Sequence, residues 1–244
     1  MNSSIHAPRP DQIAELTRGL DLPLVALEDV YLRIIADGLV QAFTDIRHNA
    51  PDTVGTGNEA QITALLEARL NAMIEDDPFW RQLVAAVVRG KESLSFDGSH
   101  LEKRPDLSIL LTARSRRFPL IAEAKIIDAS KGEGLYCSHG IQRFLNGEYG
   151  WGGREAFMIA YVRDGSTIAT RLVPYLQSPK QLATYSVEHQ PTTISVGAYD
   201  AAMSKHGRAF LYSHSAPPAD IPGPIALWHL WVDASAVEQT PIDE

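Results

Sequence analysis

Residues 104–128 read RPDLSILLTARSRRFPLIAEAKIID and limit the fold more than any other stretch of the chain. Two apolar segments, 107–113 and 118–127, flank a basic corner, and this pattern predicts an antiparallel hairpin. The second segment is apolar on both faces, as in a strand covered on both sides, yet it carries Glu123 and Lys125. Residues two apart on a strand point to the same face, so we expect these two side chains to lie together.

A second acid belongs to the same hairpin. Asp106 opens the first strand, directly after Pro105, and sixteen residues separate it from Glu123. An unpaired buried charge costs several kcal/mol, so two acids and a lysine within a sheet require partners or a ligand. Carboxylate oxygens are the ligands that Mg²⁺ and Mn²⁺ prefer. The hairpin therefore favours a divalent cation site.

The pattern Pro105-Asp106, a spacer and Glu123-Ala124-Lys125 resembles the PD-(D/E)XK nuclease superfamily, the fold of many restriction endonucleases and repair nucleases. The resemblance implies an α/β fold with a restriction-endonuclease-like mixed central sheet flanked by helices. Here it would carry an N-terminal helical extension and extra C-terminal strands. It also implies phosphodiester hydrolysis with Mg²⁺ or Mn²⁺.

The same resemblance suggests a role for each residue. Asp106 and Glu123 would be catalytic metal ligands, and the carbonyl of Ala124 would be a further ligand. Lys125 would orient or deprotonate the attacking water, or neutralise developing negative charge. Burial beside a metal would lower the pKa of Lys125 and permit the basic role.

A further acid is expected on a helix over residues 59–74. Asn58 is a favourable N-cap, and many members of the superfamily carry an acidic ligand on a helix before the sheet. Glu59 is the position that matches, as both a catalytic and a metal-binding residue, and Glu67 is a weaker competitor. Glu59 is equally explained as an acid stabilised by the helix dipole.

The charge distribution bears on nucleic-acid binding. The net charge of -8 opposes it, but Lys103–Arg154 carries nine basic and five acidic residues, a net of +4, which leaves -12 elsewhere. We expect this segment to contact nucleic acid, with DNA as the leading substrate, through Arg116, Arg117 and Arg143. The resemblance adds Gln142, because some branches of the superfamily carry a Gln on the helix that follows the Glu-x-Lys strand. Arg143 is also explained as an exposed helical arginine. The acidic remainder would oppose indiscriminate binding or face a protein partner.

The length favours one domain over residues 11–232. It would comprise a helical extension (11–58), a core (59–177) and a C-terminal β elaboration (178–232), between a disordered N-terminus (1–10) and an acidic tail (233–244). Hydrophobic periodicity predicts helices at 11–19, 24–47, 59–74, 78–89, 135–146 and 167–177, and a loop at 49–58. It predicts strands at 93–96, 107–113, 118–127, 156–162, 194–198, 209–214 and 225–232.

Other features narrow the function classes. A single cysteine excludes an internal disulfide framework and a multi-cysteine zinc site. No apolar run approaches a membrane span and residues 1–10 lack a signal-peptide core, so we expect a cytoplasmic protein with no membrane partner. The leading function is a metal-dependent nuclease, in restriction or antiviral defence; endonuclease and exonuclease action, a homodimer and a partner chain all stay open. The alternative is a catalytically inactive nuclease-like binding or structural subunit, which the net charge favours.

Overall fold

The computed structural model describes residues 10–99, 103–197, 199–212 and 221–236. Of the N-terminus expected to be disordered, only Pro10 is described, and it begins a helix. Of the expected acidic tail, residues 237–244 lie outside these ranges.

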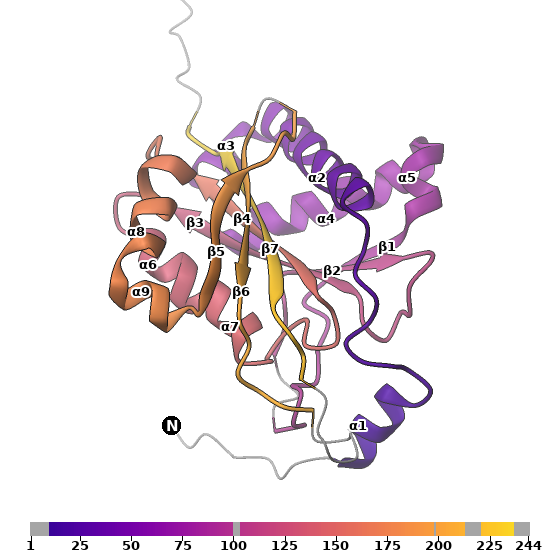
Figure 1. The fold of residues 1–244 in the computed structure, drawn as a ribbon. Coiled ribbons are helices and arrows are strands. Elements are labelled where there is room, and N and C mark those ends of the chain that lie inside the picture. Colours follow the sequence, from indigo (N-terminus) through magenta and orange to yellow (C-terminus); the bar gives the residue numbers. More distant parts are fainter. Residues whose placement is uncertain (1–9, 100–102, 198, 213–220, 237–244) are drawn as a thin grey trace, which may run out of the picture.

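A seven-stranded mixed sheet forms the centre of the molecule, in the order β1-β2-β3-β4-β7-β6-β5 (Figure 1). Strands β3, β4 and β7 are parallel to one another, and the other neighbouring pairs are antiparallel. The α/β class with a mixed sheet flanked by helices is thus confirmed. The strands are β1 Val84–Arg89, β2 Leu107–Leu111, β3 Leu120–Ile127, β4 Glu155–Val162, β5 Val187–Thr193, β6 Asp200–His206 and β7 Ile225–Asp233.

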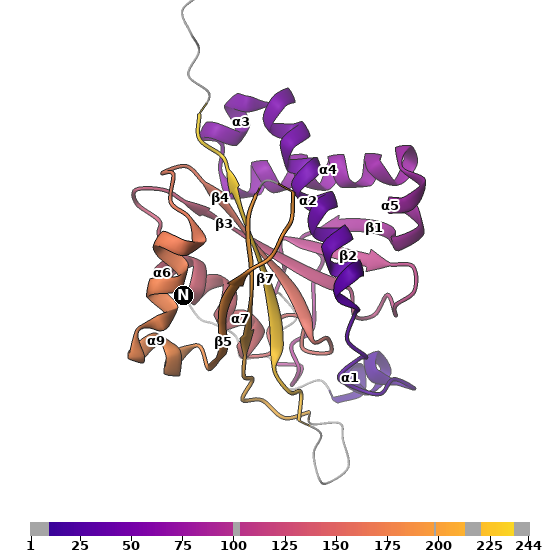
Figure 2. The same ribbon diagram turned by 45° about the horizontal axis from the view of Figure 1, so that its top comes forward.

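Helices cover both faces of this sheet (Figure 2). On one face lie α2 Asp29–Asn49 and α4 Glu59–Asp76, with α3 Pro51–Thr56 and α5 Pro78–Leu83 at their ends. The other face carries α6 Glu133–Tyr136, the π-helical turn η1 Cys137–Ile141, α7 Gln142–Leu145, the π-helical turn η2 Ile168–Leu172, α8 Val173–Gln177 and α9 Pro179–Thr184. Helix α1 Pro10–Thr17 lies apart, at the lower end of the view in Figure 1.

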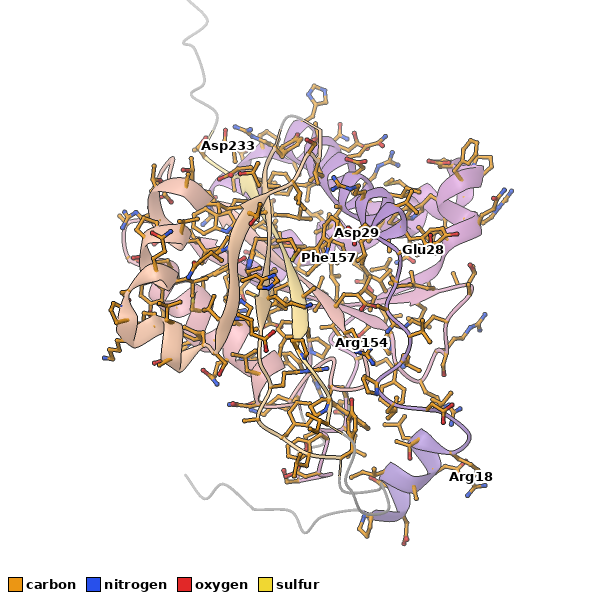
Figure 3. All side chains as sticks on the ribbon, in the orientation of Figure 1. Arg18, Glu28, Asp29, Arg154, Phe157 and Asp233 are labelled. Atoms are coloured by element: carbon orange, nitrogen blue, oxygen red, sulfur yellow. The ribbon has the colours of Figure 1, made fainter. Side chains whose placement is uncertain are left out.

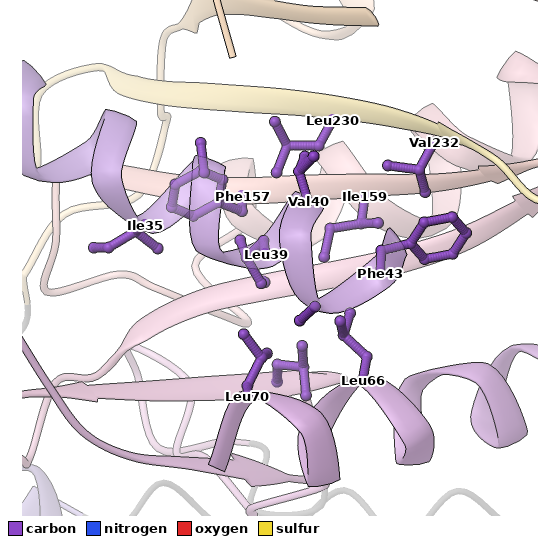
Figure 4. Close-up of a cluster of buried hydrophobic side chains, with 14 of the residues drawn as sticks. Ile35, Leu39, Val40, Phe43, Leu66, Leu70, Phe157, Ile159, Leu230 and Val232 are labelled. Carbon is purple, nitrogen blue, oxygen red and sulfur yellow. The ribbon is translucent and has the colours of Figure 1, made fainter. Parts of the chain in front are cut away.

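The larger core fills the space between α2, α4 and the sheet (Figure 4). Apolar residues recur on one side of each helix at the spacing of an amphipathic helix, so that side meets the strands. The contacting side chains are Ile35, Leu39, Val40 and Phe43 of α2, Leu66 and Leu70 of α4, Phe157 and Ile159 of β4, and Leu230 and Val232 of β7. This packing fixes the start of α4 over β3, which positions the site.

The N-terminal segment between α1 and α2 is held against the start of β4. The backbone N–H of Leu24 donates to the carbonyl of Gly152 at 2.8 Å, and Nε of Arg154 (labelled in Figure 3) donates to the carbonyl of Leu24 at 3.2 Å. The carboxylate of Glu155 accepts from Arg114 at 2.8 Å and from the N–H of Leu27 at 3.1 Å. These contacts bring α1 and the β2–β3 turn to the same end of the sheet.

The hairpin, α4, β4 and β7 lie where the sequence predicts them. The helix expected over residues 78–89 is wrong in its second half, because α5 ends at Leu83 and the chain continues as β1. The first strand expected at 93–96 is also wrong, since only an isolated bridge between Ser93 and Lys103 forms there. The loop expected at 49–58 contains the short helix α3.

The last third differs more. The strands expected at 194–198 and 209–214 are wrong, because β5 and β6 occupy earlier residues in the chain. Ile194 adds one ladder hydrogen bond beyond β5, from its N–H to the carbonyl of Ala201 at 3.0 Å. Residues 198, 213 and 214 of those expected strands lie outside the described ranges.

Candidate active site

The candidate site lies where β3 loses its neighbour on one side. Strand β2 pairs with β3 only as far as Leu107 opposite Ala122, whereas β3 continues beside β4 to Ile127. The backbone groups of Ala124 and Ile126 therefore face no strand on the β2 side. Two carboxylates take the place of the missing strand, because the N–H of Ala124 donates to Oδ2 of Asp106 at 2.8 Å and the N–H of Ile126 donates to Oε2 of Glu59 at 3.2 Å.

The ammonium group of Lys125 lies among these acids. Its Nζ donates to Oε1 of Glu123 at 2.9 Å, to Oε1 of Glu59 at 3.0 Å and to the carbonyl of Ala124 at 2.5 Å. Oδ2 of Asp106 is 3.5 Å from the same atom. The structure thus brings together all four acidic and basic residues predicted as catalytic, with the Ala124 carbonyl beside them. We call Glu59, Asp106, Glu123 and Lys125 the acid–lysine cluster.

The start of α4 leaves Glu59 available for this cluster. The side chain of Asn58 accepts from the N–H of Gln61 at 3.0 Å, and the side chain of Gln61 accepts from the N–H of Asn58 at 2.8 Å. This capping box satisfies the helix end without Glu59. Glu67 instead accepts from the N–H of Arg89 at 3.0 Å. The geometry therefore separates Glu59, which reaches β3, from its competitor.

Glu123 is the most buried member of the cluster, with 1% of its side chain exposed. Its Oε1 accepts from Lys125 and, at 2.6 Å, from Nη1 of Arg143, while its buried Oε2 has no hydrogen-bond partner within the described part of the chain. Burial raises the pKa of Glu123 to about 7, and the charge of Asp106 adds to the rise, although Lys125 and Arg143 oppose it. The positive charges of Lys125 and Arg143 therefore do not fully offset the effect of burial on the pKa of Glu123.

Lys125 responds to the same surroundings in the opposite way. Burial alone would lower its pKa, but the charges of Glu123, Asp106 and Glu59 outweigh burial and raise the pKa of Lys125 above its ordinary value. The expectation of a lowered pKa relied on a metal beside the amine. Among the carboxylates of the cluster the amine stays protonated, which favours charge neutralisation over proton abstraction as its role.

Arg143 links the cluster to the opposite helical layer. Besides its bond to Glu123, its Nη1 donates to the hydroxyl of Tyr149 at 3.1 Å, and the guanidinium carbon lies 5.4 Å from the centroid of the Tyr149 ring. Gly140 in the preceding turn allows close approach, since a Cβ there would lie 2.3 Å from Cε of Met158. Arg143 is thus an internal partner of Glu123, a contact that the sequence did not predict.

Two other predicted nucleic-acid contacts, Gln142 and Arg117, bind partners outside the cluster. Gln142 donates from its amide to Oδ1 of Asn146 at 2.8 Å. Arg116 and Arg117 occupy the β2–β3 turn, at the far end of the hairpin from Asp106. Arg117 donates from Nη1 to the carbonyl of Arg18 at 2.9 Å, which anchors the end of α1.

The oxygen donors of the cluster are of the kind that a hard divalent cation prefers. The cluster holds three carboxyl groups, those of Glu59, Asp106 and Glu123, beside the two cations Lys125 and Arg143, and one oxygen of Glu123 is buried with no hydrogen-bond partner among the described residues. Mg²⁺ and Mn²⁺ prefer such oxygen ligands. As the side chains stand, no group of three or more His, Cys, Asp or Glu residues in the described ranges forms a metal site, and the ammonium of Lys125 lies between the acids.

No helix within the described part of the chain has the length and apolar character needed to cross a membrane. Comparisons with protein-family models, with curated proteins and with solved structures gave no match.

Proposed function

We propose that this protein is a metal-dependent nuclease that hydrolyses phosphodiester bonds of DNA at the acid–lysine cluster. The observation that carries the proposal is the convergence of Glu59, Asp106, Glu123 and Lys125 on the free edge of β3. The order α4, β1, β2, β3, α6 to α7, β4 supports it, because this is the order of the restriction-endonuclease-like core that the Asp106 to Lys125 motif resembles. Restriction or antiviral defence is the setting that the resemblance suggests.

Each group in the cluster would have a distinct task. Glu59, Asp106, Glu123 and the carbonyl of Ala124 would hold Mg²⁺ or Mn²⁺, which supplies positive charge to the phosphoryl oxygens when bound. Lys125, kept protonated by its acidic neighbours, would stabilise the negative charge that develops as water attacks phosphorus. Arg143 would offer its guanidinium to a phosphate oxygen beside Glu123.

A second candidate function is a nuclease-like binding or structural subunit without turnover. One observation favours it: Glu59 and Asp106 accept hydrogen bonds from backbone N–H groups of β3. The two acids could therefore serve only to link α4 and the start of β2 to β3, without any part in catalysis. The two candidates differ in whether the acids are needed for cleavage.

The test is cleavage of end-labelled DNA and RNA by the purified chain with Mg²⁺, with Mn²⁺ and with EDTA. We expect cleavage only with metal. The rate of Asp106→Asn should be at least about 100-fold below that of the wild type, because an acidic ligand is lost. Glu67→Gln is the matched control, since Glu67 lies on α4 but contacts Arg89. Cleavage by Asp106→Asn at the wild-type rate overturns the proposed site. A folded wild-type chain that cleaves neither polymer favours the binding subunit.

A further inference from the structure

We propose that a recess on the face of the β2–β3 hairpin that carries Glu123 receives one unpaired nucleotide of the strand that is cut. This inference rests on the proposed nuclease function and adds the form of its substrate. The recess has a volume of about 460 Å³, within the range of small-molecule sites, roughly 300–1,000 Å³. It lies between α1, the β2–β3 hairpin and the loop that contains Gly150 and Trp151.

The recess lies on the same face of β3 as Glu123. Ile121 lines it and precedes Glu123 by two residues, so the two side chains share a face about 7 Å apart along the strand. Gly150 lines it too and follows Tyr149, whose hydroxyl accepts from Arg143. A strand with one phosphate at Arg143 would therefore have its neighbouring nucleotide at the recess.

The interior of the recess suits a flat, apolar ring. Phe118 and Trp151 are buried there and pack edge to face, with ring centroids 4.8 Å apart. Ile121, Leu94 and Pro119 supply further apolar lining. Nucleic-acid bases bind aromatic side chains irrespective of sequence, because every base presents a π face.

The rim of the recess suits an anion. Lys91, Arg116 and Arg117 line it and are exposed, whereas its one acid, Glu92, is bound by Nη2 of Arg104 at 2.5 Å. Arg117 is already engaged with the carbonyl of Arg18 at the end of α1, so Lys91 and Arg116 are the cations that we assign to phosphate. A nucleotide joins a flat ring to a phosphate, so the apolar interior and the basic rim together match a nucleotide.

An unpaired nucleotide is required because a base within a duplex is stacked and paired. It enters a recess only by leaving the helix, at a cost that a single strand does not bear. We therefore expect the protein to bind single-stranded DNA more tightly than the same sequence as a duplex.

The test measures binding rather than cleavage, in EDTA, by fluorescence anisotropy with labelled single-stranded DNA, its duplex and the equivalent RNA. Ser93→Trp places a bulky ring in the lining of the recess, and a second variant combines Lys91→Gln with Arg116→Gln. The charge-matched control combines Lys180→Gln of α9 with Arg81→Gln of α5, exposed residues outside the recess lining. Near-ultraviolet circular dichroism establishes that each variant is folded.

We expect both recess variants to weaken single-strand binding at least about tenfold, the control to bind as the wild type does, and duplex binding to change less than about twofold. Loss of RNA binding in Ser93→Trp would equally support a nucleotide site. Unchanged single-strand binding in both recess variants, or equal wild-type affinity for single strand and duplex, overturns the inference. If the protein cleaves DNA but the recess variants bind as the wild type does, the role of the recess is rejected and the nuclease function stands. If binding depends on the recess but no cleavage occurs, the nuclease function is rejected and the nucleotide site stands.

Discussion

Glu59 and Lys125 lie 66 residues apart in the sequence, yet Oε1 of Glu59 accepts from Nζ of Lys125 at 3.0 Å. The other carboxylate oxygen accepts from the N–H of Ile126. One side chain at the start of α4 therefore holds both the side chain and the backbone at the free edge of β3. Stability and proposed catalysis depend on the same contact.

Glu59→Gln is expected to lower the free energy of unfolding by about 1–3 kcal/mol, because Lys125 is largely buried and loses a charged partner. Glu67→Gln on the same helix is the control and should cost less than about 1 kcal/mol, since its pair with Arg89 is more exposed. Urea denaturation of the two variants measures the difference. Equal costs would show that the Glu59 contact does not stabilise the fold.

Arg143→Gln should reduce kcat/KM for cleavage by about 100-fold, because Arg143 both neutralises Glu123 and is placed to hold a phosphate. Tyr149→Phe removes only the hydroxyl that accepts from Arg143, and its effect should stay below about fivefold. Steady-state kinetics of both variants distinguish the two roles. If Tyr149→Phe is as damaging as Arg143→Gln, the hydroxyl and not the charge of Arg143 is what the site needs.

Glu123 should make the fold less stable as the pH rises from about 4.5 to 7. Its raised pKa, about 7, means that in this interval the unfolded chain has released the proton while the folded chain retains it. The contribution is fully present below the unfolded pKa and falls by up to about 3 kcal/mol by pH 7. Glu123→Gln does not titrate. The difference in unfolding free energy between wild type and variant should therefore shift across this range, and parallel curves would contradict the shifted pKa.

Two buried histidines, His206 and His229, should lower the free energy of unfolding in acid. His206 Nδ1 faces the carbonyl of Tyr185 at 2.8 Å and must donate, so its Nε2 accepts from the hydroxyl of Ser204. The hydroxyl of Ser204 also lies 2.7 Å from Nε2 of His229, and the hydroxyl of Tyr136, which donates to the carbonyl of Met158 at 3.2 Å, lies 2.8 Å from Nδ1 of His229. Both rings are fully buried, and burial favours their neutral form. Burial lowers the pKa of His206 to about 4 and that of His229 to about 3.

Because both values lie below that of the unfolded chain, the stabilisation is complete above about pH 6.5 and is lost as the pH falls. At pH 5 the loss should be about 2 kcal/mol per histidine. His206→Gln should flatten the dependence of unfolding free energy on pH by that amount, whatever its absolute stability. His189→Gln, at an exposed site, should leave the slope unchanged. A wild-type curve that is flat between pH 7 and 5 would contradict the neutral network.

The sequence predicted the centre of the molecule well, for a physical reason. Charged residues within an apolar strand pair have few alternatives to a shared site, so the cluster residues of the hairpin could be identified. Asn58 and the apolar stripe of α4 likewise located a helix whose first residue is Glu59. What the sequence left undecided was the direction of the Glu59 side chain, which depends on how α4 packs over β3.

The errors fall where local pattern and tertiary environment disagree. Val84–Arg89 is apolar enough to continue α5, but it pairs with β2 and buries Val84 and Val87 against the larger core. β5 lies at the edge of the sheet and is largely exposed, so it lacks the alternation that marks a strand. β6 uses two small residues, Ala201 and Ala202, whose strand propensity is low. The contact of Arg143 with Glu123 was missed because it joins a helix to a strand.

The role of Lys125 is decided by the initial rate at which Lys125→Met cleaves single-stranded DNA with Mn²⁺. The variant keeps an apolar side chain of similar length but removes the charge at the centre of the acid–lysine cluster. We predict a rate at least about 100-fold below that of the wild type, with Lys180→Met on α9 fully active. Cleavage by Lys125→Met at the wild-type rate would show that the acid–lysine cluster does not need the charge of Lys125 for catalysis.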